Sequence, residues 1–144
     1  FYDTYECSDN KFIAVGSIEP QFYSELLDKL EIDDKRFQDQ HNKDLWPELK
    51  EIMTLKIKSK SRSEWVDIFS DSDACVSPVL SMDEAQQHPH NLEREAFINI
   101  DGFNQPNASP RYSKTTPEIK YNAKEVGADL DDVCKEFNLS KDVF

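Results

Sequence analysis

Glycine and cysteine are scarce in this sequence of 144 residues, and long apolar runs are missing from it. The three glycines are spread over the chain, at Gly16, Gly102 and Gly127. They form no glycine-rich loop of the kind that holds phosphate groups. The apolar runs are a few residues long, too short for a membrane-spanning helix of about 20 residues. The cysteines are odd in number and widely spaced, so we expect reduced thiols in an intracellular compartment rather than a disulfide framework.

Basic residues are also few: 17 Lys and Arg stand against 29 Asp and Glu, for a net charge of -12. This balance argues against nucleic acid and against an anionic membrane surface as partners. It also argues against a polyphosphate ligand held by this chain alone. One basic cluster comprises Lys56, Lys58, Lys60 and Arg62. We interpret it as the solvated end of a helix, where cations are favoured.

The first third of the sequence predicts a hairpin and a helix. The runs YDTYEC and KFIAVGS are β-like and are separated by Ser-Asp-Asn, which suits a turn. Pro20 fits the first position of a helix, where its missing N–H needs no partner. Phe22, Leu26 and Leu30 then recur every four residues and predict one buried helical stripe.

The middle of the chain predicts three more helices and two strands. Asp44 is the expected N-cap of a second helix, and Ser61 or Ser63 that of a third, RSEWVDIFS. Ser81 and Glu84 form a capping-box pattern for a fourth. CVSPVL is expected to form a buried strand or extended segment, bent at its proline, and FINI is another strand candidate. The two tryptophans are expected in the core, at helix starts.

The composition changes at Gly102, and from there to about Ala123 the chain is rich in Pro, Asn, Ser and Thr. A last helix is expected over about residues 129–137. The predicted fold class is α+β: a small antiparallel sheet with short flanking helices, then an extended linker and a C-terminal helix. We expect a small α+β domain over 1–101, the linker over 102–123 and a C-terminal helical segment over 124–144.

Glu19 is the carboxylate best placed for a functional role. In AVGSIEPQF it stands at a strand-to-helix junction, at the N-cap position, where the helix dipole favours a negative charge. Two roles fit these residues: a helix cap, or a carboxylate presented to a site.

Other candidate groups predict no chemistry. His88 and His90 lack a third ligand at a recognisable spacing, and Pro89 between them is expected to hold the backbone extended, so no metal site is predicted. Cys75 has no base near it in the sequence and is expected to be a buried structural thiol.

Five motifs in order, FYDTYEC, AVGSIEPQFYSELL, WPELKEI, SEWVDIFSDSDACVSPVLSMDEA and HPHNLEREAF, closely resemble the small domain of the CoA-thioester racemases in the family III CoA-transferase superfamily. The resemblance is strong over residues 1–99 and looser beyond. It implies a separate large domain that carries most of the CoA site and the principal acid and base, a histidine and an aspartate. It also implies an interlocked homodimer, in which the small domain of one subunit covers the active site of the other.

The family motif G-x-I-E-P-Q-F matches Gly16 to Phe22. The resemblance therefore implies that Glu19 orients the large-domain histidine across the interface and stabilises its protonated form. The implied reaction inverts C2 of a 2-methylacyl-CoA through an enolate, with acyl-CoA as substrate and no cofactor. A peroxisomal or mitochondrial location is implied by the resemblance alone.

Parts of the family pattern are missing from this sequence. His41, His88 and His90 match no catalytic histidine, and no aspartate matches the catalytic one, so we expect the chain alone to be inactive. Its first residue is Phe1 rather than Met, which suggests a processed chain or a piece of a longer one. The family often has G-E-H-[TN] before its last helix, where this chain has Gly-Ala-Asp-Leu at 127–130.

Two other functions remain open. One is the small domain of a CoA-transferase, in which a large-domain aspartate forms a mixed anhydride and then a CoA thioester. The other is a non-catalytic interaction domain of the same fold. The tripeptide Ile18-Glu19-Pro20 favours the racemase, because transferases commonly differ at this position.

Overall fold

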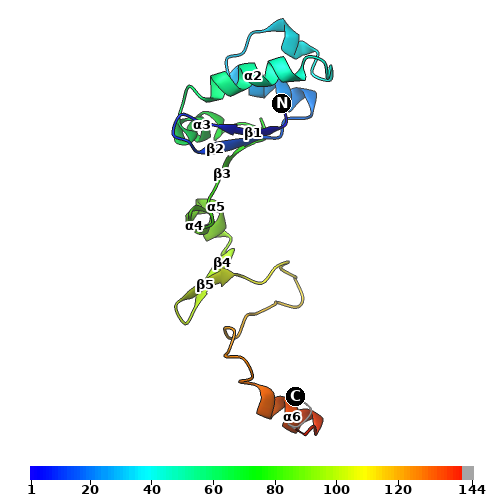
Figure 1. Cartoon of the computed structure of the whole chain (residues 1–144), viewed down its shortest axis with the longest axis vertical. Coiled ribbons are helices and arrows are strands. Elements are labelled where there is room, and N and C mark those ends of the chain that lie inside the picture. Colours follow the sequence, from blue (N-terminus) through cyan, green and yellow to red (C-terminus); the bar gives the residue numbers. More distant parts are fainter. Residues whose placement is uncertain (141–144) are drawn as a thin grey trace. The chain divides into compact units, whose positions relative to one another are not determined.

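The computed structural model describes residues 1–140 of the chain. It divides into two compact units, Phe1–Met82 (unit 1) and Asp83–Phe144 (unit 2). Figure 1 shows the order of the elements along the chain.

Unit 1 contains a sheet of three antiparallel strands in the order β1-β2-β3. The strands are β1 (Asp3–Glu6), β2 (Phe12–Val15) and β3 (Val76–Val79). The register pairs Thr4 with Ala14 and Ala14 with Ser77. Asn10 in the β1–β2 turn has a positive φ of 59°, which asparagine tolerates better than most residues. The predicted hairpin is confirmed.

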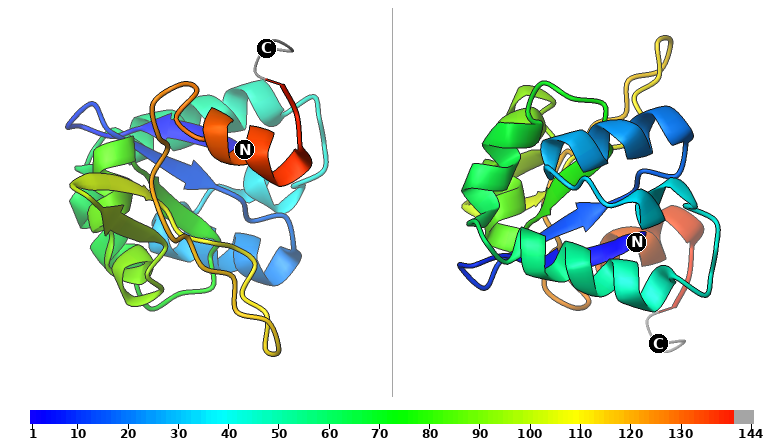
Figure 2. Two further views of the ribbon diagram at one scale, coloured as in Figure 1. Left: turned by 90° about the horizontal axis from the view of Figure 1, so that it is seen from below. Right: turned by 90° about the horizontal axis from the view of Figure 1, so that it is seen from above.

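Three α-helices cover one face of this sheet (Figure 2). They are α1 (Pro20–Lys29), α2 (Trp46–Ile57) and α3 (Arg62–Phe69), and a short 3₁₀ helix, η1 (Lys35–Gln38), precedes α2. Ser61 begins α3 with a complete capping box to Glu64, as the sequence predicts for that position. The prediction for α2 was wrong by one residue, since Leu45 rather than Asp44 is the N-cap.

The core of unit 1 lies between the helices and the sheet. Its buried members are Tyr5, Cys7, Ile13, Val15, Tyr23, Leu26, Leu30, Phe37, Leu49, Met53, Ile57, Trp65, Phe69 and Ala74. Trp65 is fully buried, and its indole N–H donates to the Ile57 carbonyl at 2.8 Å. The prediction that both tryptophans are core residues holds for Trp65, whereas Trp46 is only half-buried.

The segment CVSPVL differs from its predicted form. β3 is an edge strand and is only half-buried, and its Pro78 suits an edge because it has no N–H to donate. Cys75 is exposed, so the prediction of a buried thiol was wrong. The reason lies in the backbone: Cys75 has a positive φ of 51°, and its carbonyl accepts a hydrogen bond from Gly16 N–H at 2.9 Å. The side chain thereby leaves the core, which is filled at this point by Ala74.

Unit 2 begins within α4 (Met82–Gln87), a helix that starts directly after Ser81 as predicted. Its later helices are α5 (Pro89–Glu93) and α6 (Leu130–Phe137), the second of which confirms the expected C-terminal helix. The expectation of extended backbone at Pro89 was wrong, because Pro89 occupies the first position of α5. Residues 141–144 of the predicted C-terminal segment lie outside the described residues.

A second antiparallel sheet, of β4 (Phe97–Ile100) and β5 (Phe103–Pro106), lies in unit 2. The structure confirms FINI as a strand and adds β5 within the segment predicted as a linker. Asp101 and Gly102 join the strands with positive φ values of 51° and 86°, as a tight hairpin turn of the Asp-Gly type requires. The domain boundaries at 101 and 123 stay predictions.

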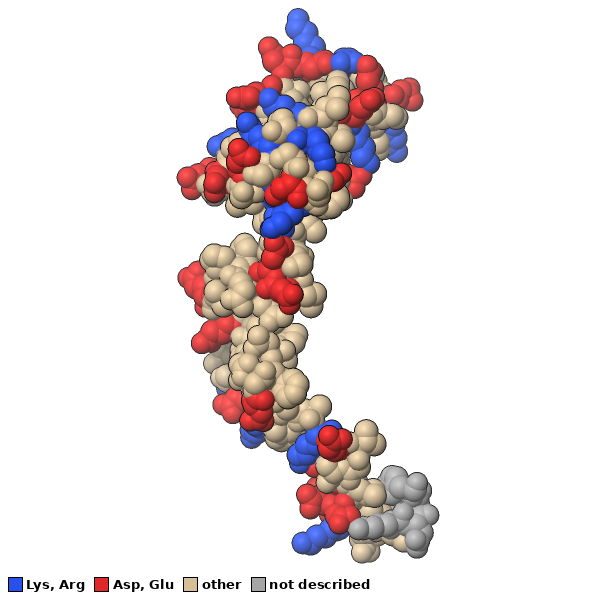
Figure 3. All heavy atoms as spheres, turned by 60° about the vertical axis from the view of Figure 1, so that its left-hand side comes forward, with Lys and Arg blue, Asp and Glu red and all other residues tan. Residues whose placement is uncertain are grey.

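Charged side chains of both signs are interspersed on the face of unit 1 seen in Figure 3. Three lysines of the basic cluster have partners within unit 1. The Lys56 ammonium lies 2.9 Å from a Glu31 carboxylate oxygen, and that of Lys58 lies 3.0 Å from Glu6. The Lys60 ammonium makes a cation–π contact with the Trp65 ring. Within residues 1–140, no helix is both long and apolar enough to cross a membrane.

We expect Leu26→Ala to lower the free energy of unfolding of unit 1 by about 2–5 kcal/mol, because Leu26 is wholly buried and the substitution leaves a cavity. The matched control is Leu55→Ala on α2, where the side chain is 69% exposed and the change should stay within about 0.5 kcal/mol. Both tryptophans lie in unit 1, so denaturant unfolding followed by tryptophan fluorescence reports on this unit. Equal effects of the two substitutions would contradict the assigned core.

Asp34 should show an acid-dependent contribution to stability. Its carboxylate accepts hydrogen bonds from the Arg36 side chain and from Arg36 N–H, which lower the pKa of Asp34 to about 2. A carboxyl group whose pKa is lower folded than unfolded, where it is about 3.9, stabilises the fold above pH 4. We expect that contribution to disappear as the pH falls from about 4 to about 2, and to be missing in Asp34→Asn. Carbon-13 NMR of the carboxyl group measures the midpoint; a value near 4 would refute the pairing.

Candidate functional site

Glu19 lies where the chain passes from β2 to α1. It is the N-cap residue of α1 by position, with extended backbone angles (φ -69°, ψ 142°), and its carbonyl accepts from Tyr23 N–H at 2.9 Å. The predicted position is therefore confirmed. Its side chain, however, makes no capping hydrogen bond. The carboxylate is exposed, and no hydrogen bond or ion pair joins it to another residue within 1–140. Its catalytic role stays a prediction.

The backbone before Glu19 is held firmly on the β3 side. Ser17 is wholly buried, and its hydroxyl donates to the Ala74 carbonyl. Gly16 N–H donates to the Cys75 carbonyl at 2.9 Å. These two bonds tie the end of β2 to the start of β3. No local pattern in the sequence predicts the burial of Ser17.

On the other side, the junction is held by Gln40. This residue follows η1 and is 7% exposed. Its side-chain amide donates to the Ile18 carbonyl at 2.7 Å, and its own carbonyl accepts from the Trp46 indole N–H at 2.9 Å. Sequence reasoning missed Gln40 because it lies in a charged link whose pattern carries no signal of burial.

A hollow of about 470 Å³ opens beside this junction. Most of the hollow is apolar, and its lining comprises Phe1, Tyr2, Ile18, His41, Trp46, Pro47 and Lys50. Ile18 immediately precedes Glu19 and is about half exposed. An apolar group in this hollow would therefore contact the residue next to the carboxylate.

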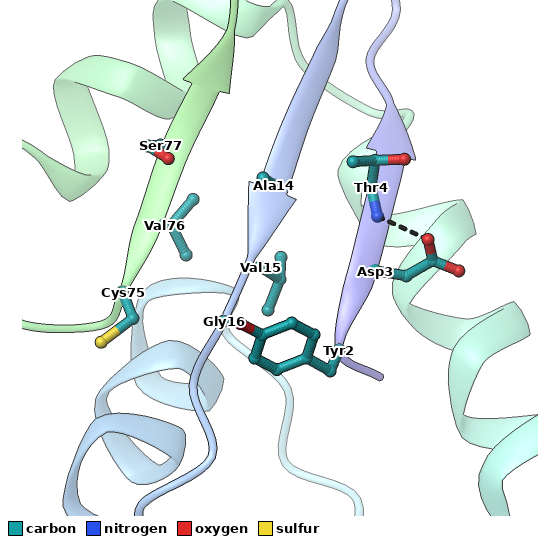
Figure 4. Close-up of a pocket in the computed structure, with 9 residues that line it drawn as sticks. All are labelled: Tyr2, Asp3, Thr4, Ala14, Val15, Gly16, Cys75, Val76 and Ser77. Atoms are coloured by element: carbon teal, nitrogen blue, oxygen red, sulfur yellow. Dashed lines mark hydrogen bonds between the residues drawn. The ribbon is translucent and has the colours of Figure 1, made fainter.

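A second hollow, of about 670 Å³, lies on the outer face of the sheet (Figure 4). Thr4, Ala14 and Ser77 stand side by side across the three strands, and the Tyr2 ring lies against Gly16. A Cβ atom at Gly16 would lie 3.5 Å from the Cys75 carbonyl oxygen and from the Tyr2 ring, which is ordinary contact. Crowding within the chain therefore does not require glycine at position 16.

The three histidines are divided between the two units. His41 lines the apolar hollow of unit 1 and is exposed, whereas His88 is the N-cap of α5 and His90 lies within that helix in unit 2. Within the part of the chain that the structure describes, no group of three or more histidine, cysteine or acidic side chains is arranged to hold a metal ion. The arrangement at the junction thus offers one exposed carboxylate and an apolar surface.

Comparison with known proteins identifies the family of this chain. The model of CoA-transferase family III matches residues 1–130. The chain is 39% identical to alpha-methylacyl-CoA racemase of Mus musculus and 36% identical to that of Homo sapiens, each over 99% of this chain and 38% of the relative. It is 32% identical to the CaiB/baiF CoA-transferase family protein ZK892.4 of Caenorhabditis elegans, over 76% of this chain. The chain thus spans about 38% of the length of the two racemases.

Solved structures agree on the fold. The orthorhombic form of Rv3272 from Mycobacterium tuberculosis matches with a TM-score of 0.68 at 17% identity, covering 81% of this chain and 34% of that one. Its D175A mutant matches with a TM-score of 0.64 at 16% identity, covering 84% and 37%. The family model and the identity to the racemases together show that this chain belongs to CoA-transferase family III.

Proposed function

We propose that this chain is the small domain of a racemase that interconverts (R)- and (S)-2-methylacyl-CoA. The observation that carries the proposal is the 36–39% identity, over 99% of the chain, to two relatives named alpha-methylacyl-CoA racemase. In this proposal Glu19 orients a histidine of the large domain.

The proposed reaction needs few groups from this domain. The thioester acidifies the proton on C2; a base removes it from one face, an enolate forms, and an acid returns a proton on the other face. Both groups belong to the large domain. A carboxylate beside an imidazole fixes its tautomer and favours its protonated form. The exposed and unpaired carboxylate of Glu19 has the freedom to make such a contact with a residue outside this chain.

The surroundings of Glu19 suit this substrate class. The apolar hollow that Ile18 lines suits the acyl part of the thioester. The net charge of -12 argues that the phosphates of CoA are held elsewhere. Acyl-CoA is the substrate, and the proposed reaction uses no further cofactor.

The proposed partners are the large domain and a second subunit of an interlocked homodimer. Unit 2 supports this assignment, because Cys134 is the one buried residue among those described there. Large apolar side chains of the unit lie exposed, among them Phe103, Tyr121, Val126 and Phe137. Such surface is normally covered in a complete protein. A peroxisomal or mitochondrial location is proposed on the family resemblance alone.

A CoA-transferase is the second candidate. The family name and the relative from Caenorhabditis elegans favour it. In that case the large domain carries a nucleophilic aspartate, and Glu19 has no proton-transfer partner. A non-catalytic domain of the same fold is the third.

We expect Glu19→Gln in the full-length protein to slow deuterium incorporation at C2 of a 2-methylacyl-CoA in heavy water. The loss should be about 100-fold or more, because a neutral amide no longer stabilises the protonated histidine. The matched control is Glu51→Gln, which removes an exposed carboxylate from α2 and should leave the rate unchanged.

Two outcomes would overturn the assignment. Unchanged exchange in Glu19→Gln would show that Glu19 only occupies the N-cap position of α1 and takes no part in proton transfer. If the unaltered full-length protein showed no deuterium incorporation, the racemase assignment would fail. The next reaction to assay would then be the transfer of CoA from one acyl group to another.

We expect the 144-residue chain alone to show no exchange above the uncatalysed rate, since it lacks the proposed acid and base. Purified chain and full-length protein are compared at equal molar concentration in the same assay. Measurable turnover by the chain alone would refute this division of labour between the domains.

A further inference from the structure

Gln40 is a buried polar side chain in an otherwise charged segment between α1 and α2. Burying a carboxamide is unfavourable unless its groups find partners. The amide of Gln40 has such a partner, the Ile18 carbonyl at 2.7 Å, 22 positions away in the sequence. A long-range bond of this kind fixes one backbone group relative to another part of the fold.

The bond acts directly on Glu19. The Ile18 carbonyl belongs to the same rigid peptide group as the Glu19 nitrogen. Holding that oxygen fixes the orientation of the peptide plane, in which the Glu19 Cα atom lies. The Glu19 carboxylate touches no other described side chain through a hydrogen bond or ion pair, so within the described residues only the backbone restrains where this side chain begins.

Gln40 is itself held in place from two directions. Its carbonyl accepts from the Trp46 indole N–H at 2.9 Å, at the start of α2. Three residues earlier, the fully buried Phe37 anchors η1 in the core. The Gln40 backbone is therefore tied to α2 by a hydrogen bond and to the core of unit 1 through η1.

We propose that Gln40 is a positioning residue: through the Ile18–Glu19 peptide it fixes the backbone from which the Glu19 side chain reaches its partner. This inference rests on the proposed function of Glu19. It assigns to the link between α1 and α2 a role in the reaction that its composition does not indicate.

The test is a double-mutant cycle in the full-length protein. Gln40→Leu keeps a similar volume but removes the donor to Ile18. We expect kcat for racemisation to fall about 10- to 100-fold with little change in KM, since displacement of a catalytic group by about 1 Å has effects of this size. In the Glu19→Gln background the same substitution should lower kcat less than about threefold, because the group it positions is already lost.

Asn91→Leu is the matched control. The Asn91 carboxamide donates to the Ala85 carbonyl at 2.8 Å, and the residue is half-buried. The substitution therefore removes the same kind of bond from unit 2. We expect kcat to stay within about twofold of the parent in both backgrounds. Thermal unfolding of each variant, measured alongside, shows that the folded protein is being compared.

Gln40→Glu provides a second reading if Gln40→Leu does not fold. A carboxylate cannot donate to the Ile18 carbonyl, whereas the protonated acid can. The activity of Gln40→Glu relative to the parent should therefore rise as the pH is lowered. A ratio that does not change with pH would count against the proposal.

The outcomes separate the two claims. If Glu19→Gln is impaired while folded Gln40→Leu matches the parent, the role of Gln40 is refuted and that of Glu19 stands. If Gln40→Leu lowers kcat by the same factor in both backgrounds, Gln40 acts independently of Glu19 and the inference fails. If Glu19→Gln has full activity, the proposed function of Glu19 fails first, and the positioning role fails with it.

Discussion

The burial of one face of β2 is the constraint on which the position of the site depends. Ile13 and Val15 point into the core, where each contributes about 1.5–3 kcal/mol, while Phe12 and Ala14 face the opposite side. A shift of the strand by one residue would exchange the two faces. The register therefore fixes where β2 ends, and with it the point at which the chain leaves the sheet toward Glu19.

Apolar packing fixes where an element lies, but hydrogen bonds to single carbonyls fix how a peptide group is turned. At this junction the bond from Ser17 to the Ala74 carbonyl is buried, and the bond from Gln40 to the Ile18 carbonyl is partly buried. A hydrogen bond shielded from water is stronger than an exposed one, because less water competes for its partners. The backbone that carries Glu19 is thereby fixed, while its exposed side chain makes no hydrogen bond or ion pair among the described residues and keeps both carboxylate oxygens available to a partner.

Local patterns predicted the hairpin, α1 and the start of α3, because spacing of apolar residues and capping residues act over a few positions. They also located Glu19 at its junction. They were wrong for Cys75, whose exposure follows from a backbone turn closed by the distant Gly16. β5 was missed although Asp101-Gly102 suits a hairpin turn, because Asn, Gln and Pro in the strand weaken its β-pattern. Gln40 was beyond prediction, since its partners become neighbours only in the folded chain.

The net negative charge of the chain affects which part of a CoA thioester it could contact in the proposed reaction. CoA carries several negative charges, and 29 acidic residues in this chain stand against 17 basic ones. Four of the basic residues form the cluster near α3, where Lys56 and Lys58 already pair with carboxylates of the same unit. Binding of CoA by these lysines would compete with those pairs. In the proposed racemase, the negative charge of this domain therefore favours contact with the acyl end of the thioester over contact with its phosphates, and the apolar hollow beside Glu19 suits that end.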